Sequence, residues 1–160
     1  MEDTLDDDHA ATDLAGFFAD LVRCETRLYN ALNDRLRERH GIVTSQYEFL
    51  GYLHRHPGCR VADLAAEFAI GVGATSKGVD RLEKQGWAAR RPNPADRRSS
   101  LLVLTDEGTR LVQEAEQTFT EGLTELLAGP LDAPALSSTA RALATLRSTL
   151  ERDQVGTPTG

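Results

Sequence analysis

Two stretches of the chain carry side chains suited to contact with an anionic partner. Residues 73–77 read Gly-Ala-Thr-Ser-Lys, and their hydroxyl and ammonium groups can donate hydrogen bonds. Residues 92–100 read Pro-Asn-Pro-Ala-Asp-Arg-Arg-Ser-Ser and place two guanidinium groups at the tip of a turn. Guanidinium groups bind phosphate and the acceptor edges of bases through paired donors. The chemistry predicted for both stretches is therefore recognition of phosphate and base edges.

The net charge of −7 argues at first sight against such a partner, but its distribution does not. Residues 1–20 contain seven acids and no lysine or arginine, so they account for the whole excess. Residues 71–104 contain seven bases against three acids, a local charge of +4. Charges further apart than about 10 Å are largely screened at cellular salt, so the local balance decides whether phosphate binds.

The apolar pattern predicts the elements that position these stretches. Residues 61–68 form a short helix, residues 69–73 a turn, and residues 74–85 a second helix, which Gly86 ends. Residues 87–104 then form a two-stranded hairpin with the basic turn at its tip, and residues 59–61 are extended and suited to be a third strand. The predicted unit is a helix that can enter a groove of DNA beside a loop that can reach the next groove.

Longer helices flank this unit on both sides. An apolar stripe predicts a first helix over residues 12–40, ended by Gly41. The next helix starts at Thr44 or Ser45, where Ser45 and Glu48 fit a capping box, and it stops before His56. Residues 105–152 carry two further helices with leucine stripes, the first capped by Thr105 and the second beginning near Asp132.

The fold class predicted is mainly α (α+β), a winged helix-turn-helix with long terminal helices that pair two subunits. A first helix of roughly 25 residues is longer than a small domain needs for its own core. Leucine stripes at both ends suit a helical dimer interface, although closing an intramolecular core is the alternative. The predicted organisation is an acidic, disordered arm over residues 1–11, one domain over residues 12–152 and a frayed tail over residues 153–160. Within that domain, residues 12–40 and 105–152 would form the dimerisation helices and residues 44–104 the winged helix-turn-helix.

Composition and motifs exclude several other classes. No run approaches the ~18 apolar residues of a membrane span, and the acidic N-terminus lacks signal-peptide features, so a cytoplasmic location is expected. Two cysteines are too few for a disulfide framework. We find no glycine-rich phosphate loop, no nucleophile elbow and no paired metal ligands, so neither an enzyme nor a cofactor is expected.

The order of four sequence pieces resembles the MarR family of bacterial transcription regulators. The match as a whole spans about residues 14–150. The four pieces that carry it are Leu64-Ala65 in the first short helix, Val79-Asp80-Arg81-Leu82-Glu83-Lys84-Gln85-Gly86-Trp87, Asp96-Arg97-Arg98-Ser99 in the wing, and Leu104-Thr105-Asp106-Glu107-Gly108. The resemblance implies a dimer that binds a pseudo-palindromic site in double-stranded DNA. The second short helix would lie in the major groove and the wing in the flanking minor groove.

The resemblance also implies which residues meet the DNA. Arg98 would enter the minor groove, and Asp96 would hold the wing in shape by pairing with an arginine, an ordinary turn residue being the alternative. Ser76 and Lys77 stand where family members often have Thr-Arg, and a lysine lacks the bidentate fork. Arg90 and Arg91 would contact phosphate or lie on a solvated strand edge. The full set of expected DNA contacts is Gly73, Ala74, Thr75, Ser76, Lys77, Arg81, Arg90, Arg91, Asp96, Arg97 and Arg98.

Members of the family often respond to small aromatic or phenolic ligands held between the DNA-binding part and the dimer helices. The candidate lining residues here, which could equally be packed residues with no ligand, are Arg23, Tyr29, Tyr47, Tyr52 and His54. An oxidation response through Cys24, with Cys59 as a resolving thiol, is an alternative, against inert thiols. Zinc is a further alternative, but His54 and His56 point to different faces of a helix.

The function predicted is that of a dimeric, sequence-specific, DNA-binding transcription regulator, a ligand-responsive repressor, with an activator as the less common alternative. The alternatives are a redox- or zinc-responsive regulator of the same fold, and a winged-helix module that contacts proteins and not DNA. The basic wing and the polar start of the second short helix argue against the last of these.

Overall fold

The computed structural model describes residues 13–159, so the predicted acidic arm over residues 1–11 lies outside the described residues. The elements follow in the order α2 (Leu14–His40), α3 (Thr44–Arg55), α4 (Val61–Phe68), α5 (Val72–Lys84), β1 (Ala88–Pro92), β2 (Ser100–Leu104), α6 (Asp106–Leu123), the π-helical turn η1 (Thr124–Ala128) and α7 (Ala133–Arg152). The predicted mainly helical winged helix-turn-helix is confirmed. None of the described helices is long and apolar enough to cross a membrane.

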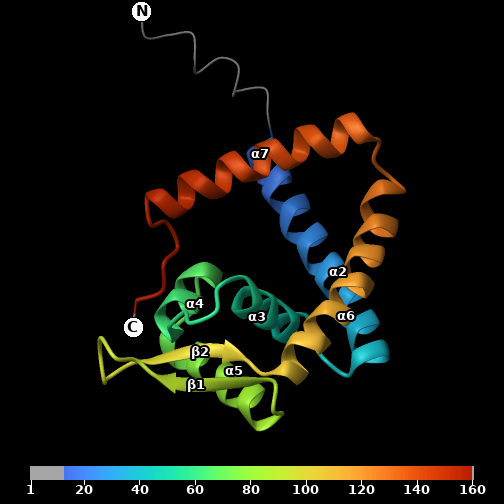
Figure 1. Cartoon of the computed structure of the whole chain (residues 1–160). Coiled ribbons are helices and arrows are strands. Elements are labelled where there is room, and N and C mark those ends of the chain that lie inside the picture. Colours follow the sequence, from blue (N-terminus) through green and yellow to red (C-terminus); the bar gives the residue numbers. More distant parts are fainter. Residues whose placement is uncertain (1–12, 160) are drawn as a thin grey trace, which may run out of the picture.

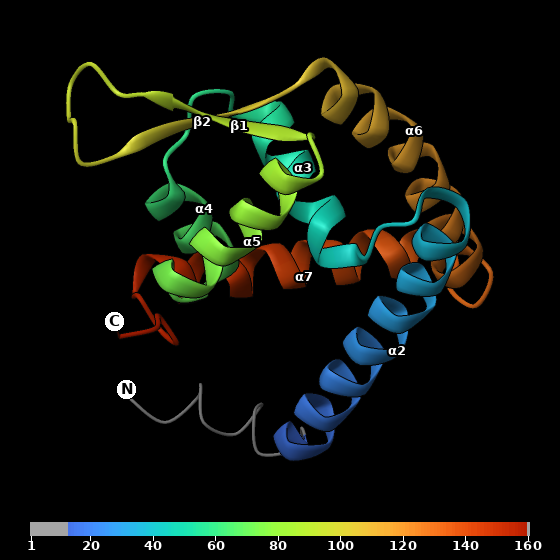
Figure 2. The same ribbon diagram turned by 90° about the horizontal axis from the view of Figure 1, so that it is seen from below.

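The elements fall into two groups (Figure 1). Helices α3, α4 and α5 and the hairpin lie together at one end of the molecule, and α7 crosses the opposite end. Helices α2 and α6 run between the two ends and pack on each other. Seen from below in Figure 2, α5 and the hairpin are nearest to the viewer, and the loop between β1 and β2 extends away from the helices.

The hairpin is antiparallel and regular over its five residue pairs. Ala88 pairs with Leu104, Arg90 with Leu102 and Pro92 with Ser100. The third strand predicted over residues 59–61 is reduced to a single bridge between Cys59 and Leu102. The Leu102 amide donates to the Cys59 carbonyl at 2.7 Å. This bridge joins the hairpin to the start of α4.

One apolar cluster holds the winged helix together. Leu50 and Leu53 of α3, Leu64 of α4, and Val79 and Leu82 of α5 are fully or almost fully buried in it. Leu36, Ile42, Leu102, Val112 and Ala115 extend the cluster to α2, β2 and α6. Burying a leucine stabilises a fold by about 2 kcal/mol, so this cluster fixes the position of α5 relative to the hairpin.

The predicted helix ends are mostly correct because they depend on local chemistry. Gly41 ends α2 with a φ of 68°, and the Asp132 carboxylate caps α7 by accepting the Ala135 amide at 2.9 Å. The capping box predicted for Ser45 and Glu48 is wrong. The side-chain oxygen of Gln46 instead accepts the Val43 amide at 3.0 Å, one residue before the predicted start.

Hydrogen bonds of Thr105 connect the start of α6 to the start of the hairpin. The Thr105 hydroxyl accepts the Gly108 amide at 3.0 Å and donates to the Gly86 carbonyl at 2.7 Å. The Thr105 amide donates to the Trp87 carbonyl at 3.0 Å. A Cβ on Gly108 would lie 1.9 Å from that carbonyl oxygen. The segment 104–108 therefore serves the fold, and only glycine fits at its end.

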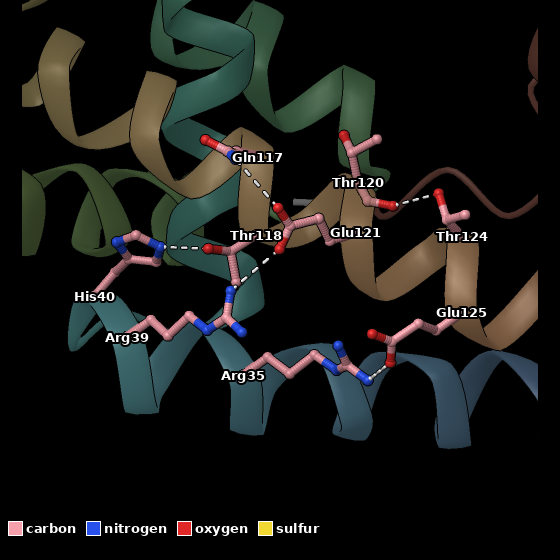
Figure 3. Close-up of polar contacts among 9 residues, drawn as sticks. All are labelled: Arg35, Arg39, His40, Gln117, Thr118, Thr120, Glu121, Thr124 and Glu125. Atoms are coloured by element: carbon pink, nitrogen blue, oxygen red, sulfur yellow. Dashed lines mark hydrogen bonds and ion pairs between the residues drawn. The ribbon is translucent and has the colours of Figure 1, made fainter.

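A polar seam joins the C-terminal half of α2 to α6 and η1 (Figure 3). His40 contacts the Thr118 hydroxyl at 2.8 Å, and Arg39 pairs with Glu121 at 3.2 Å. Arg35 pairs with Glu125 at the end of the seam. Exposed ion pairs contribute little each, about 0.2–1 kcal/mol, so the seam sets the direction of α2 more than it stabilises the fold.

The N-terminal half of α2 and the whole of α7 present apolar faces to solvent. Phe17 and Phe18 of α2 are 54% and 66% exposed. Leu143, Leu146 and Leu150, which are spaced along one face of α7, are each about 40% exposed. None of the α7 residues is buried within the part of the chain that the structure describes. The alternative that these stripes close an intramolecular core is therefore wrong for α7.

Candidate nucleic-acid interface

The start of α5 presents some of the predicted contact residues and hides one. Helix α5 begins at Val72, two residues before the predicted start. Gly73, Ala74 and Lys77 are exposed, and Ser76 is half-buried. Thr75 is fully buried, and its hydroxyl donates to the Gly71 carbonyl at 2.9 Å.

The prediction that Thr75 meets DNA is therefore wrong. The reason is helical spacing: Thr75 lies four residues before Val79 and seven before Leu82, so it shares their inward face. The outward face of α5 carries Lys77 and Arg81, both exposed.

Glycines in α5 serve two different purposes. A Cβ on Gly73 would meet nothing within 4 Å, whereas a Cβ on Gly78 would lie 2.8 Å from the Phe49 ring. That ring is itself held beside Phe68, with the two centroids 5.4 Å apart. Gly78 thus lets α5 approach α3 closely, and Gly73 is open to a partner.

This difference predicts opposite effects of the same substitution. Gly73→Ala should raise the free energy of unfolding by about 0.5 kcal/mol, because alanine favours a helix. Gly78→Ala should lower it by about 1–2 kcal/mol through overpacking against Phe49. Urea unfolding of the two variants checks both signs. A Gly78→Ala variant at least as stable as the unchanged protein would show that the close approach of α5 to α3 does not limit residue 78.

The wing tip is shaped by its own short polar side chains. The Asp96 carboxylate accepts the Arg98 amide at 2.9 Å, and the structure shows no ion pair between Asp96 and an arginine among the described residues. The side-chain oxygen of Asn93 accepts the Ala95 amide at 3.0 Å, and the side-chain amide of Asn93 donates to the Ser99 hydroxyl at 2.9 Å. Asp96 therefore holds the wing through the backbone and not through an arginine, which corrects the prediction.

The arginines on the hairpin differ in their freedom. Arg97 and Arg98 at the tip and Arg91 on β1 are exposed, and no partner for their guanidinium groups is recorded within residues 13–159. Arg90 is 22% exposed and pairs with Asp80 at 2.7 Å and with Glu83. The prediction that Arg90 contacts phosphate is therefore corrected, because its donors are already engaged with α5.

Sequence reasoning missed Asn93 in the wing and the acids that hold Arg90. A signal for these acids was present: Asp80 and Glu83 are three residues apart and share one face of α5. Among the predicted DNA contacts, five exposed cations then remain. They are Lys77, Arg81, Arg91, Arg97 and Arg98.

The structure does not bring the candidate effector residues together. Tyr47 stacks on Phe119 with ring centroids 4.4 Å apart, while Tyr52 lies against His56 at 4.4 Å. Arg23 and His54 are exposed. The prediction of one pocket lined by these five residues is wrong, because the tyrosines of α3 point to different neighbours.

Tyr29 and Glu48 lie together between α2 and α3. Burial, followed by repulsion from Glu48, raises the pKa of the Tyr29 hydroxyl. Burial and then repulsion from Glu25 raise the pKa of the Glu48 carboxyl. Both groups are therefore biased toward their neutral forms.

A groove lies between α4 and α7. It has a volume of about 1430 Å³, and Tyr52, Ile70, Leu146 and Leu150 contribute to its walls. Arg147 of α7 crosses it to pair with Glu67 of α4 at 3.0 Å. Of the candidate effector residues, this groove contains Tyr52 alone.

The cysteines and histidines give little support to the alternative signals. Cys24 is exposed, and burial raises the pKa of the Cys59 thiol to about 11. A thiol with so high a pKa is a poor nucleophile at neutral pH, so Cys59 is not suited to resolve a disulfide. Among the described residues, no three potential metal ligands cluster.

The architecture defines a winged helix-turn-helix protein, and comparisons with known proteins narrow the class. The sequence model described as the MarR family matches residues 40–99. HTH-type transcriptional regulator BilQ of Clostridium symbiosum is 30% identical over 84 residues, which are 52% of this chain and 58% of that protein. The multiple antibiotic resistance protein MarR of Escherichia coli is 27% identical over 110 residues, 66% of this chain and 76% of that protein.

Solved structures show the same fold. Sco3205, a MarR family transcriptional regulator from Streptomyces coelicolor solved in complex with DNA, matches with a TM-score of 0.77 and 24% identity, covering 84% of this chain and 85% of that chain. A mutant of Escherichia coli MarR complexed with operator DNA matches with a TM-score of 0.73 and 24% identity, covering 84% and 99%. The chain is similar to MarR-family regulators, and the family model matches its residues 40–99. It spans 58% and 54% of the lengths of the two BilQ proteins it matches.

Proposed function

We propose that the protein binds double-stranded DNA as a homodimer and regulates transcription as a ligand-responsive repressor. The observation that carries the proposal is the group of exposed cations Lys77, Arg81, Arg91, Arg97 and Arg98 on α5, β1 and the wing, beside a helix that is free to enter a groove. The DNA complexes of Sco3205 and Escherichia coli MarR support the same use of this fold.

Binding to non-specific DNA at rising salt tests the proposal. A protein that neutralises phosphates loses affinity steeply as the salt concentration rises. The logarithm of its binding constant falls with the logarithm of the salt concentration, with a slope of about −0.9 for each phosphate neutralised. A winged-helix module that contacts only proteins would not bind DNA even at low salt. That result would reject the repressor function and favour the protein-contact alternative.

Arg98→Ala should weaken binding to every DNA sequence by about tenfold, since a cation in the minor groove contributes through charge and groove width. Ser76→Ala and Lys77→Ala, at the start of α5, should instead change which sequences are preferred. Electrophoretic mobility shift on a set of operators measures both. Arg141→Ala, an exposed arginine of α7, is the control. Unchanged operator affinity of the Arg98 variant would exclude insertion of the wing.

The dimer part of the proposal rests on the exposed apolar faces of α2 and α7. Reading two half-sites requires two recognition helices related by a twofold axis, about 34 Å apart. The exposed phenylalanines of α2 and leucines of α7 are the available apolar surface for such pairing. Pairing would also remove these side chains from water.

The ligand part of the proposal places the effector in the groove between α4 and α7. The charged groups on its walls are Asp63, Glu67 and Glu151 against the single base Arg147. A neutral phenol fits this balance better than an aromatic carboxylate. Titration of the protein–operator complex with phenols and with benzoates tests this choice, and release by benzoates alone would contradict it.

A further inference from the structure

One side chain of the hairpin binds three positions on α5. The Arg90 guanidinium pairs with Asp80 at 2.7 Å and with Glu83, and it donates to both the carbonyl and the hydroxyl oxygen of Ser76 at 3.2 Å. The Arg90 amide also donates to the Glu83 carboxylate at 3.3 Å. Residues 76, 80 and 83 lie four and three apart, so they share one face of α5.

We propose that Arg90 is a positioning residue that locks the wing to the recognition helix at a fixed separation before DNA is bound. The inference rests on the proposed DNA-binding function. Recognition requires α5 and the wing to enter neighbouring grooves together, and any freedom between them would have to be lost on binding. Arg90 removes that freedom beforehand, with the hairpin strand supplying the guanidinium and α5 supplying its partners.

The charge balance of the cluster excludes a second role as a phosphate contact. Arg90 faces two carboxylates, so the cluster of Arg90, Asp80 and Glu83 is net negative. The Arg90 side chain is 22% exposed, whereas the neighbouring Arg91 is exposed and has no ion-pair partner within residues 13–159. Arg91 is therefore the phosphate contact on β1, and Arg90 acts through α5.

The same contact orients Ser76 at the DNA-facing start of α5. The Ser76 oxygen accepts a hydrogen bond from Arg90, and no acceptor for its hydroxyl proton is recorded among the described residues. The hydroxyl is thereby set to donate. It would meet hydrogen-bond acceptors on the DNA, which in the major groove are purine N7, guanine O6 and thymine O4.

Operator affinity measured as a function of salt tests the proposal on the full-length protein. Arg90→Ala should lower affinity about tenfold or more and leave the salt slope unchanged, because no phosphate contact is lost. Arg91→Ala, the matched control on the same strand, should reduce the slope by about 0.9. Arg90→Lys should behave as Arg90→Ala, since the single ammonium group of lysine cannot replace the planar guanidinium that reaches three partners. A salt slope reduced by about 0.9 in the Arg90 variants would overturn the proposal.

A substitution of the partner acid gives a test of opposite sign. Removing a negative charge from a DNA-facing helix should by electrostatics alone raise the affinity for DNA. If Glu83 holds Arg90 in place, Glu83→Ala should lower operator affinity severalfold instead. A rise in affinity would overturn the positioning role.

Amide hydrogen exchange without DNA separates this proposal from the proposed function. Arg90→Ala and Arg90→Lys should speed exchange at the amides of β1 and the wing, while Arg91→Ala should not. Unchanged exchange in the Arg90 variants would contradict the positioning role of Arg90 even if the protein binds DNA. If exchange is faster in the Arg90 variants but the protein binds no DNA at low salt, the contact between Arg90 and α5 is supported and the DNA-binding function is rejected.

Discussion

Alanine at position 108 is expected to lower the free energy of unfolding by about 3 kcal/mol, the upper range for overpacking in a core. The added Cβ would lie 1.9 Å from the Trp87 carbonyl oxygen, a backbone atom that cannot rotate away. That oxygen also accepts the Thr105 amide at 3.0 Å, so moving it breaks the joint between α6 and the hairpin. Thermal unfolding followed by circular dichroism should show a midpoint lower by roughly 10 °C.

Gly73→Ala is the matched control, because it makes the same chemical change in the first turn of a helix with nothing within 4 Å of the new methyl group. Helix propensity alone would stabilise both variants. An unfolding midpoint of Gly108→Ala at or above that of the unchanged protein would show that the joint can relax. If the unfolding midpoint falls in Gly108→Ala and not in Gly73→Ala, the glycine of the Leu-Thr-Asp-Glu-Gly segment is needed for packing.

The sequence was sufficient to predict the helices because their ends depend on local chemistry. Gly41 can adopt a positive φ, and Thr105 can accept an amide of the following turn, whatever the rest of the chain does. The apolar residues of α5 repeat with the helical period, which places Val79 and Leu82 on the inward face where the structure buries them. These features need no knowledge of distant neighbours.

The roles of single polar residues could not be predicted in the same way, because they depend on what lies across the contact. The polar type of Thr75 suggested an outward side chain, but its place on the inward face and the nearby Gly71 carbonyl satisfy it inside. Arg90 and Arg91 are equally basic by type. The position of β1 over α5 brings Arg90 to Asp80 and Glu83 and leaves Arg91 exposed. For the candidate effector site, the three tyrosines were grouped by type, whereas Tyr47 and Tyr52 pack on different elements.

These corrections sharpen the proposed DNA contacts. Without Thr75 and Arg90, the expected contacts on α5 and β1 are the exposed residues Gly73, Ala74, Lys77, Arg81 and Arg91, together with the half-buried Ser76. The wing contributes Arg97 and Arg98, held by the turn that Asp96 and Asn93 shape. Positioning and contact are thus divided between different residues, which makes the two roles separable by substitution.

A glutamate in place of Leu146 is expected to convert the proposed dimer into a monomer. Leu146 is the middle member of the leucine row on α7 and is 40% exposed, so a charge there would be buried by a partner but tolerated in a single chain. Operator affinity should fall by about 10²–10⁴-fold, the gain that linking two binding modules provides. Light scattering coupled to size-exclusion chromatography measures the mass, and mobility shift measures the affinity.

Leu131→Glu is the matched control, since Leu131 is 38% exposed and precedes α7. It adds the same charge, so any general repulsion of DNA affects both variants equally. If the α7 leucines served only the single chain, Leu146→Glu would unfold the protein without producing a folded monomer, and circular dichroism would detect that. A folded Leu146→Glu dimer with full operator affinity would remove α7 from the interface and leave the exposed phenylalanines of α2 as its apolar part.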